Sequence, residues 1–154
     1  PFRGEAVKVK KVLLATDGSP GALKAARMLG ELAQRLPDLQ ITVVNVAQVP
    51  RSYLITDEFG HKIAPEVPMD VMIRRKAEPI LKQTLEALGL PEDRVHTEVQ
   101  VGEPAEEIVD PARLDGYDLI VVGSRGLSPV KELLLGSVSH RVVHTAPCPV
   151  MVVR

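Results

Sequence analysis

Apolar strand-like runs alternate with amphipathic helix-like segments along most of this chain. The strand-like runs cover residues 9–15, 41–47, 95–101, 119–122 and 150–153, and the helix-like segments cover residues 20–36, 69–88, 104–114 and 138–145. Each crossover between parallel strands needs a helix-sized connection, so this alternation is typical of a parallel sheet. The pattern predicts an α/β fold, Rossmann-like and doubly wound, with a five-stranded, mostly parallel sheet and helices on both faces.

Residues with strong positional preferences mark the helix boundaries. Ser19 suits the N-cap of the first helix, Pro20 suits its first position, and Pro37 ends it. Pro79 falls inside the second helix, residues 69–88, and we expect it to bend or interrupt the middle of that helix.

The stretch from Gln48 to Pro68 departs from the alternation. It contains further prolines at positions 50 and 65, and the aromatic residues Tyr53 and Phe59. The composition predicts an irregular loop. A long loop in a compact domain can serve as a lid or a contact surface, and it can equally be an insertion without a function, so both interpretations stay open.

Size and charge exclude some classes of protein. A chain of 154 residues with 45% hydrophobic and 3% aromatic content suits one domain, residues 1–154, with an aliphatic core. The formal net charge of -1 and the scattered charged residues argue against nucleic-acid binding, which needs a concentrated basic face. No apolar run approaches the roughly 20 residues of a membrane helix, and we expect a cytoplasmic protein without a membrane partner.

A glycine motif follows the strand-like run at residues 119–122. Gly123, Gly126, Gly136 and Ser137 have the spacing G-x2-G-x9-G-S, and the last two residues open a helix-like segment. Glycines let a backbone approach an anion closely, and the free N–H groups at a helix start attract negative charge. The motif predicts a phosphate site, although glycines after a strand can also serve only as turns.

Neighbouring polar residues favour the phosphate interpretation. Arg125 and Lys131 lie within the motif, as do the hydroxyls of Ser124, Ser128, Ser137 and Ser139. Guanidinium, ammonium and hydroxyl groups all suit phosphoryl oxygens.

Asp17 follows the first strand as Gly123 follows the fourth. In a doubly wound sheet, ligands bind beyond the carboxyl ends of the strands, where the strand order reverses. If these two strands are neighbours, Asp17 could accept a hydrogen bond from a ribose hydroxyl or an adenine amine while the glycines hold phosphates.

Three segments carry a resemblance to a known family. V-L-L-A-T-D-G-S near the start, V-G-E-P-A-E-E-I in the middle and the G-x2-G-x9-G-S motif resemble the universal stress protein family, and within it the ATP-binding branch. The resemblance spans nearly the whole chain. It implies a sheet of order 3-2-1-4-5 and a site for ATP, or for ADP or AMP, with or without Mg²⁺.

The resemblance also implies roles for individual residues. Residues 15–17 and Val46 would border the nucleoside, residues 122 and 123 would close its pocket, residues 126 and 136–138 would contact phosphates, and residues 101 and 102 would lie near the pocket. Arg125 is included because of its charge and its location in the motif. The candidate residues are Ala15, Thr16, Asp17, Val46, Val101, Gly102, Val122, Gly123, Arg125, Gly126, Gly136, Ser137 and Val138.

These features lead to three functional hypotheses. The first is a nucleotide-dependent regulatory module in a stress response, dimeric through Val150 to Val153 and acting on a protein partner that the sequence does not identify. The second is a dimeric interaction protein that needs no nucleotide. The third is an ATPase. We expect its hydrolysis to be slow, because the sequence has neither a P-loop nor a G-x-G-x-x-G fingerprint and no evident general base beside the phosphates.

Metal and thiol chemistry are not indicated. His140 and His144 lie one helical turn apart, but no third ligand is evident beside them. Cys148 is the only cysteine and has no evident general base nearby, so we interpret it as a small apolar residue.

Overall fold

Five parallel strands form the sheet at the centre of this protein. The computed structural model describes residues 8–49, 56–63, 67–127 and 134–154. The strands are β1 (Lys11–Ala15), β2 (Gln40–Ala47), β3 (Val95–Val101), β4 (Leu119–Gly123) and β5 (Val150–Val153), and their order is β3-β2-β1-β4-β5. Every pairing is parallel. The predicted strand order and fold class are therefore confirmed.

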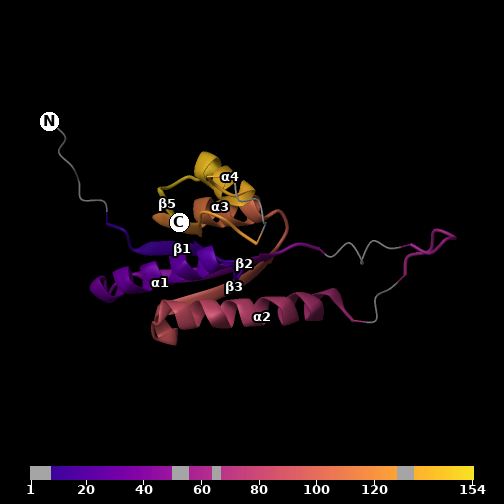
Figure 1. The fold of residues 1–154 in the computed structure, drawn as a ribbon, viewed down its shortest axis with the longest axis horizontal. Coiled ribbons are helices and arrows are strands. Elements are labelled where there is room, and N and C mark those ends of the chain that lie inside the picture. Colours follow the sequence, from indigo (N-terminus) through magenta and orange to yellow (C-terminus); the bar gives the residue numbers. More distant parts are fainter. Residues whose placement is uncertain (1–7, 50–55, 64–66, 128–133) are drawn as a thin grey trace.

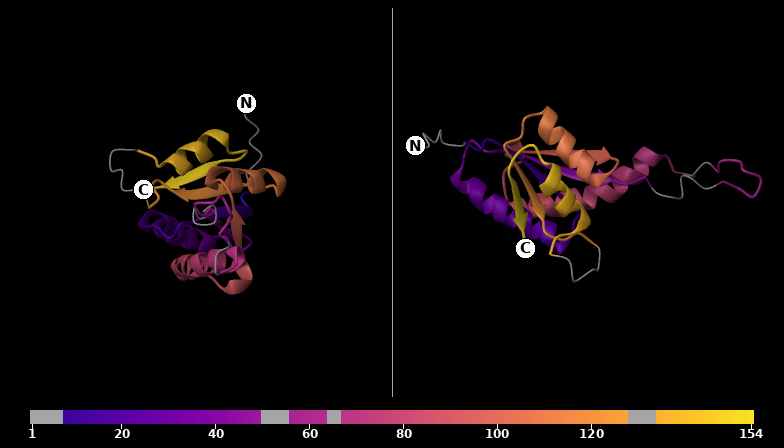
Figure 2. Two further views of the ribbon diagram at one scale, coloured as in Figure 1. Left: turned by 90° about the vertical axis from the view of Figure 1, so that its right-hand side faces the viewer. Right: turned by 90° about the horizontal axis from the view of Figure 1, so that it is seen from above.

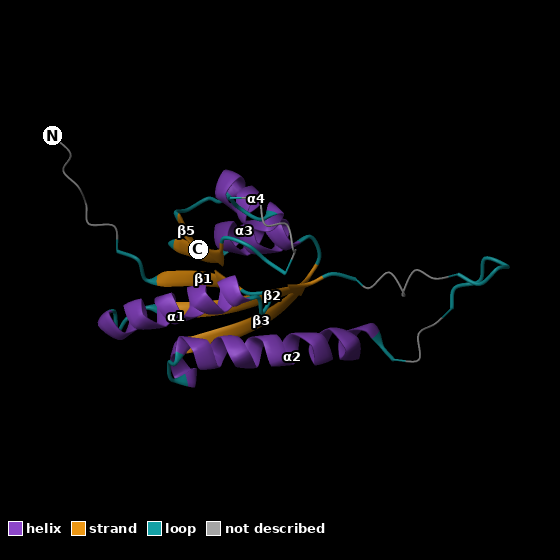
Figure 3. Ribbon diagram, in the orientation of Figure 1, coloured by secondary structure: helices purple, strands orange, loops and turns teal. Residues whose placement is uncertain are grey.

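Two pairs of helices enclose the sheet (Figures 1 and 3). The helices are α1 (Pro20–Arg35), α2 (Met69–Leu88), α3 (Pro104–Leu114) and α4 (Ser137–Thr145), with a short 3-10 turn η2 (Glu92–Arg94) before β3. Helices α1 and α2 pack on one face of the sheet, and α3 and α4 pack on the other. The two views of Figure 2 show the same layers from the side and from above.

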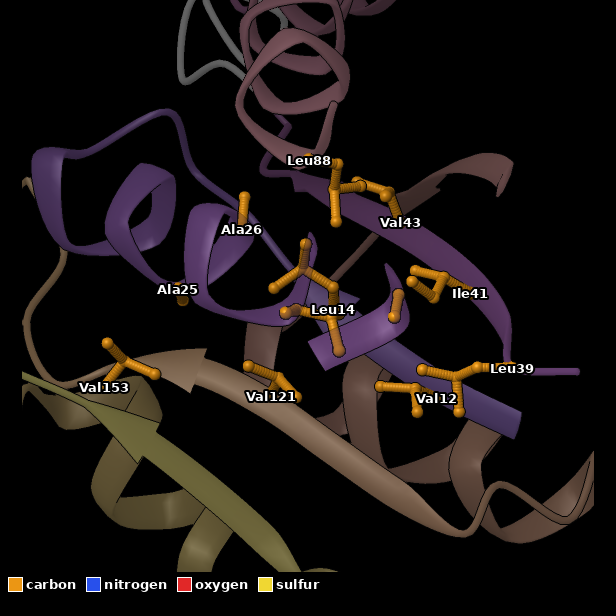
Figure 4. Close-up of a cluster of buried hydrophobic side chains, with 12 residues drawn as sticks. Val12, Leu14, Ala25, Ala26, Leu39, Ile41, Val43, Leu88, Val121 and Val153 are labelled. Atoms are coloured by element: carbon orange, nitrogen blue, oxygen red, sulfur yellow. The ribbon is translucent and has the colours of Figure 1, made fainter. Parts of the chain in front are cut away.

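Burial on both faces explains why the central strands read as continuous apolar runs. In β1, Val12 and Leu14 pack in the core on the side of α1 and α2, whereas Leu13 between them packs against α3 and α4. Figure 4 shows the first of these cores, where strand residues such as Val121 meet the small side chains of α1, among them Ala25 and Ala26.

The helix boundaries follow their predicted signals, with one exception. The Ser19 hydroxyl accepts a hydrogen bond from the Ala22 N–H at 3.3 Å, as an N-cap should, and Pro20 is the first residue of α1. Helix α2, however, runs from Met69 to Leu88 without a break at Pro79. Both Pro79 and Arg75, whose carbonyl loses its usual partner, are exposed, so water can satisfy that carbonyl.

Part of the long loop forms a small turn of its own. Thr56 and Lys62 make an isolated antiparallel bridge, and the Asp57 carboxylate accepts hydrogen bonds from the N–H groups of Phe59 and His61. This turn lies away from the sheet (Figures 1 and 2). Positions 50, 53 and 65, which helped to predict the loop, lie outside the described residues.

Within the described ranges, no helix combines the length and the apolar character that crossing a bilayer would require.

Asp118 ties β1 to the segment before β4 and gives a prediction about acid stability. Its Oδ2 accepts the N–H groups of Lys10 and Lys11, each at 2.9 Å, and these two hydrogen bonds lower the pKa of the carboxyl. A pKa lowered in the folded state stabilises the fold above the unfolded-state pKa, and the contribution is lost as the pH falls through the folded-state pKa. We therefore expect Asp118→Asn to destabilise the protein most near neutral pH.

The measurement is urea unfolding of both proteins at several pH values. The difference in the free energy of unfolding should shrink as the pH falls below about 4, where the carboxyl of the parent protein becomes protonated. A difference that stays constant down to about pH 2 would show that the charge on Asp118 does not contribute.

Candidate functional site

A cavity of about 690 Å³ lies beyond the carboxyl ends of β1, β2 and β4. Strands β1 and β4 are direct neighbours, with Val12 opposite Leu119, and this is the point at which the strand order reverses. The first and fourth strands are therefore neighbours, which was the condition for bringing Asp17 and Gly123 to one site. The volume lies in the range of about 300–1,000 Å³ that is typical of small-molecule sites.

Thr16 anchors the floor of the cavity to α2. The Thr84 hydroxyl donates to the Ile80 carbonyl at 2.8 Å, which leaves the Thr16 hydroxyl to donate to Thr84 at 2.9 Å. The Asn45 amide donates to the Thr16 carbonyl at 2.8 Å. The Thr16 side chain is thus used within the protein, and only its remaining surface can border a ligand.

Asp17 packs closely against the loop that follows β4. Its Oδ1 accepts the Ser19 N–H at 2.9 Å, and its Oδ2 lies 2.7 Å from the place that a Cβ on Gly126 would occupy. Only glycine allows this approach without displacing the carboxylate. Asp17 is also the only carboxylate residue that lines the cavity among the described residues.

The three glycines of the motif differ in what surrounds them. A Cβ on Gly123 would lie 2.7 Å from the backbone carbon of Gly21, so this glycine is required for packing against the start of α1. A Cβ on Gly136 would meet its nearest neighbours only at 3.5 Å, which is ordinary contact. Packing therefore requires glycine at position 123, whereas it does not require glycine at position 136.

Two hydrogen bonds fix the start of α4 against the end of β4. The Gly136 N–H donates to the Ser124 carbonyl at 2.7 Å, and the buried Ser139 hydroxyl donates to the Gly123 carbonyl at 2.8 Å. The Ser139 hydroxyl was a candidate phosphate donor, and this bond occupies it. Ser128 and Lys131, which the sequence also suggested, lie outside the described residues.

The N-terminus of α4 supplies hydrogen-bond donors at the wall of the cavity. The N–H groups of the first helical residues have no partner within a helix, and no side chain of the described residues caps this end. Ser137 and Val138 both line the cavity, and so does Arg125, whose cationic side chain belongs to the loop that Gly136 packs against. Donors, a positive helix end and a guanidinium group fit a phosphate well.

The structure brings together all of the candidate residues except two. The lining includes Ala15, Thr16, Asp17, Val46, Val122, Gly123, Arg125, Gly126, Gly136, Ser137 and Val138. Val101 and Gly102 do not line the cavity. Val101 is the last residue of β3 and Gly102 follows it, and the Gly102 N–H donates to the carbonyl of the lining residue Ala47 at 3.1 Å.

The sequence analysis did not predict that residues of α2 line the cavity. Met72, Ile73, Lys76 and Ile80 all line the cavity, and Lys76 is its only cationic residue besides Arg125 in the described part of the chain. The lengths of the predicted helix and strand could have indicated this contribution. A helix of 20 residues is about 30 Å long, whereas a strand of seven residues spans about 23 Å, so the start of α2 must extend past the strand ends.

Neither the histidine pair nor the cysteine joins this cavity. The rings of His140 and His144 lie 4.5 Å apart between centroids on the exposed side of α4, and the described residues hold no group of three metal-ligand side chains. Burial, followed by the charge of Asp118, raises the pKa of the Cys148 thiol, which disfavours the nucleophilic thiolate.

Comparison with known proteins relates the chain to one family over its full described length. The sequence profile of the universal stress protein family matches residues 8–154. The universal stress protein YxiE of Bacillus subtilis is 36% identical over 149 residues, which cover 94% of this chain and 98% of that protein.

Solved structures share the fold. That of MJ0577 from Methanocaldococcus jannaschii has a TM-score of 0.74 and 30% identity, and covers 94% of this chain and 95% of that chain. An Arabidopsis thaliana family member with AMP bound has a TM-score of 0.60 and 23% identity, covering 94% and 90%. Other structures of this fold are complexes with cAMP and with dAMP. The sequence match and the shared architecture together show that this chain belongs to the universal stress protein family.

Proposed function

We propose that this protein binds an adenine nucleotide, principally ATP, and acts in the cytoplasm as a nucleotide-dependent regulatory module of a stress response. One observation carries the proposal: the N-terminus of α4, which no described side chain caps, lies beside Gly126 and Gly136 and lines a cavity of about 690 Å³ at the strand-order reversal. Family members with AMP, cAMP or dAMP bound support the adenine preference.

The two ends of the cavity suit the two ends of a nucleotide. Ala15, Val46 and Val122 offer apolar surface to a base and a ribose, and Asp17 offers its carboxylate to a ribose hydroxyl. Phosphates would lie against the α4 N-terminus, where the N–H groups of Ser137 and Val138, the Gly126 backbone and Arg125 can hold them. Val101 and Gly102 would act indirectly, by holding Ala47 in place.

Calorimetric titration of nucleotide-free protein with ATP tests this proposal. We expect a dissociation constant near micromolar, equivalent to about 8 kcal/mol, and repeating the titration with Mg²⁺ shows whether the metal accompanies the phosphates. GTP is the control for the base. No heat with any nucleotide, together with an unchanged melting temperature, would overturn the proposal and favour the nucleotide-independent interaction protein.

Hydrolysis, if it accompanies binding, should be slow. Asp17 is the only carboxylate lining the described cavity, and it is already bonded to the Ser19 N–H at the nucleoside end. Phosphoryl transfer to water needs a group that positions the nucleophile near the phosphates. ADP release by the parent protein that exceeds that of the Gly136→Val variant would establish an ATPase activity.

The edge strand β5 supports a dimeric arrangement. Strand β5 pairs only with β4 among the described strands, so its other edge carries free backbone groups. Ser124 donates to the Val153 carbonyl and Ile120 to the Pro149 carbonyl, so residues 149, 151 and 153 point to β4 and Val152 points outward. We propose that the outward groups pair with β5 of a second copy.

Val152→Pro tests the dimer without breaking the sheet. Proline removes the outward N–H, and edge strands tolerate proline when the missing N–H faces solvent. Sedimentation velocity should show a dimer for the parent protein and a monomer for the variant, with similar melting temperatures. A monomer for the parent protein at micromolar concentration, or a dimer for the variant, would exclude pairing through β5.

A further inference from the structure

A second groove, of about 670 Å³, lies between α2 and the outer edge of β3. It uses a different flank of α2 from the one that lines the nucleotide cavity. Strand β3 pairs with β2 on one side, and no strand pairs with its other side in the part of the chain that the structure describes. Such an edge presents free N–H and C=O groups that an added strand can satisfy.

The floor of the groove is apolar. Ala77, Leu81 and Leu85 line it from α2, and Val99 and the methyl-bearing Thr97 line it from β3. Because side chains alternate along a strand, His96 and Glu98, which pair at 3.4 Å, belong to the other face of β3. An added strand would therefore place every second side chain over the leucines of α2.

The charged residues of the rim differ between the two ends of the groove. Helix α2 runs antiparallel to β3, because it is the crossover between two parallel strands (Figure 3). Glu86 and Glu92 therefore lie near the start of β3, and Arg74 lies toward its end. Glu78 and Lys82 lie between these two ends, and their opposite charges leave the middle of the groove with no net charge. None of these five exposed side chains forms an ion pair within the described residues.

The spacing of these charges matches an extended peptide. Arg74 and Glu86 are about 18 Å apart along the helix axis, and a strand of seven residues spans about 23 Å. A peptide bound along β3 can thus reach both charged ends of the groove while its backbone pairs with the strand.

We propose that this groove binds an extended peptide segment that runs parallel to β3, with a basic residue near its N-terminal end, apolar side chains at alternate positions and an acidic residue near its C-terminal end. The backbone pairing supplies affinity, as in other cases of strand addition. A parallel direction continues the pairing of the whole sheet, and for that direction the two charged ends fix which end of the peptide carries each charge.

Two synthetic peptides test the proposal on the whole protein. Both are acetylated and amidated and have alternating valine and threonine; the first has arginine at the N-terminal end and aspartate at the C-terminal end, and the second has the two exchanged. We expect the first to bind about tenfold more tightly, since each exposed charge pair contributes up to about 1 kcal/mol. Amide NMR shifts should move in β3.

A charge-reversed variant and a matched control complete the test. Arg74→Glu combined with Glu86→Lys changes only exposed residues, and it should reverse the preference between the peptides. Lys24→Glu combined with Glu31→Lys, on the exposed side of α1, should leave the preference unchanged. Equal affinity for both peptides, a preference that survives the reversal, or shifts confined to β5 or the nucleotide cavity would overturn the proposal.

Discussion

Gly136→Val is expected to weaken ATP binding by at least about 100-fold while leaving the fold intact. The added methyl groups would enter the space between the α4 N-terminus and residues 124–126, where the phosphates are proposed to lie. Charge-assisted hydrogen bonds contribute about 1.5–3 kcal/mol each, so losing two of them accounts for a change of this size.

The fold should survive because position 136 does not require glycine. Its φ of -65° and ψ of 163° are extended values that valine adopts readily, and a Cβ there meets its neighbours at 3.5 Å or more. Circular dichroism and the melting temperature without nucleotide check this point. A variant that is stable and still binds ATP as the parent protein does would remove the α4 N-terminus from the site.

A control at the other end of α4 separates the local effect from a general loss of helix stability. Thr145→Val also places a valine in α4, and valine has nearly the same shape as threonine. Thr145 lies at the last position of the helix, and its hydroxyl donates to the Arg141 carbonyl. The affinity of this variant for ATP should match that of the parent protein within about twofold, since the change is remote from the proposed phosphates.

Gly123 would be a misleading choice for the same experiment. Its Cβ would meet the backbone of Gly21 at 2.7 Å and that of Ala22 at 2.9 Å, so alanine there would disturb the packing of α1 on β4. The spacing of the motif could not separate Gly123 from Gly136. That difference depends on which backbone approaches each glycine in space, and the approaching residues lie about a hundred positions away in the chain.

The sequence predicted the sheet well because the periodicity of buried residues is a local property. The runs at Val12–Leu14 and Ile120–Val122 are buried on both faces and therefore lack polar breaks. Strand order came from the family resemblance. The Thr16–Thr84 hydrogen bond, by contrast, joins residues 68 positions apart, and neither threonine carries a local signal that it has a buried partner.

Gly30→Ala is expected to lower the free energy of unfolding by about 2–3 kcal/mol, against the usual effect of this substitution. In an ordinary helix interior, alanine is more favourable than glycine by about 1 kcal/mol. Here, a Cβ would overlap the carbonyl oxygen of Leu88 and lie 2.9 Å from its carbonyl carbon, because α1 packs directly on the C-terminal turn of α2. Overpacking of this kind costs about 1–3 kcal/mol or more.

Urea unfolding of Gly30→Ala beside Glu31→Ala measures this effect. Glu31 is exposed on the next position of the same helix, so its replacement should change stability by no more than about 0.5 kcal/mol. A more stable Gly30→Ala protein would mean that α2 moves aside at little cost. Because α2 also holds Thr16 through Thr84 and lines the cavity with Ile80, such movement would reach the proposed nucleotide site, and ATP affinity should then change together with stability.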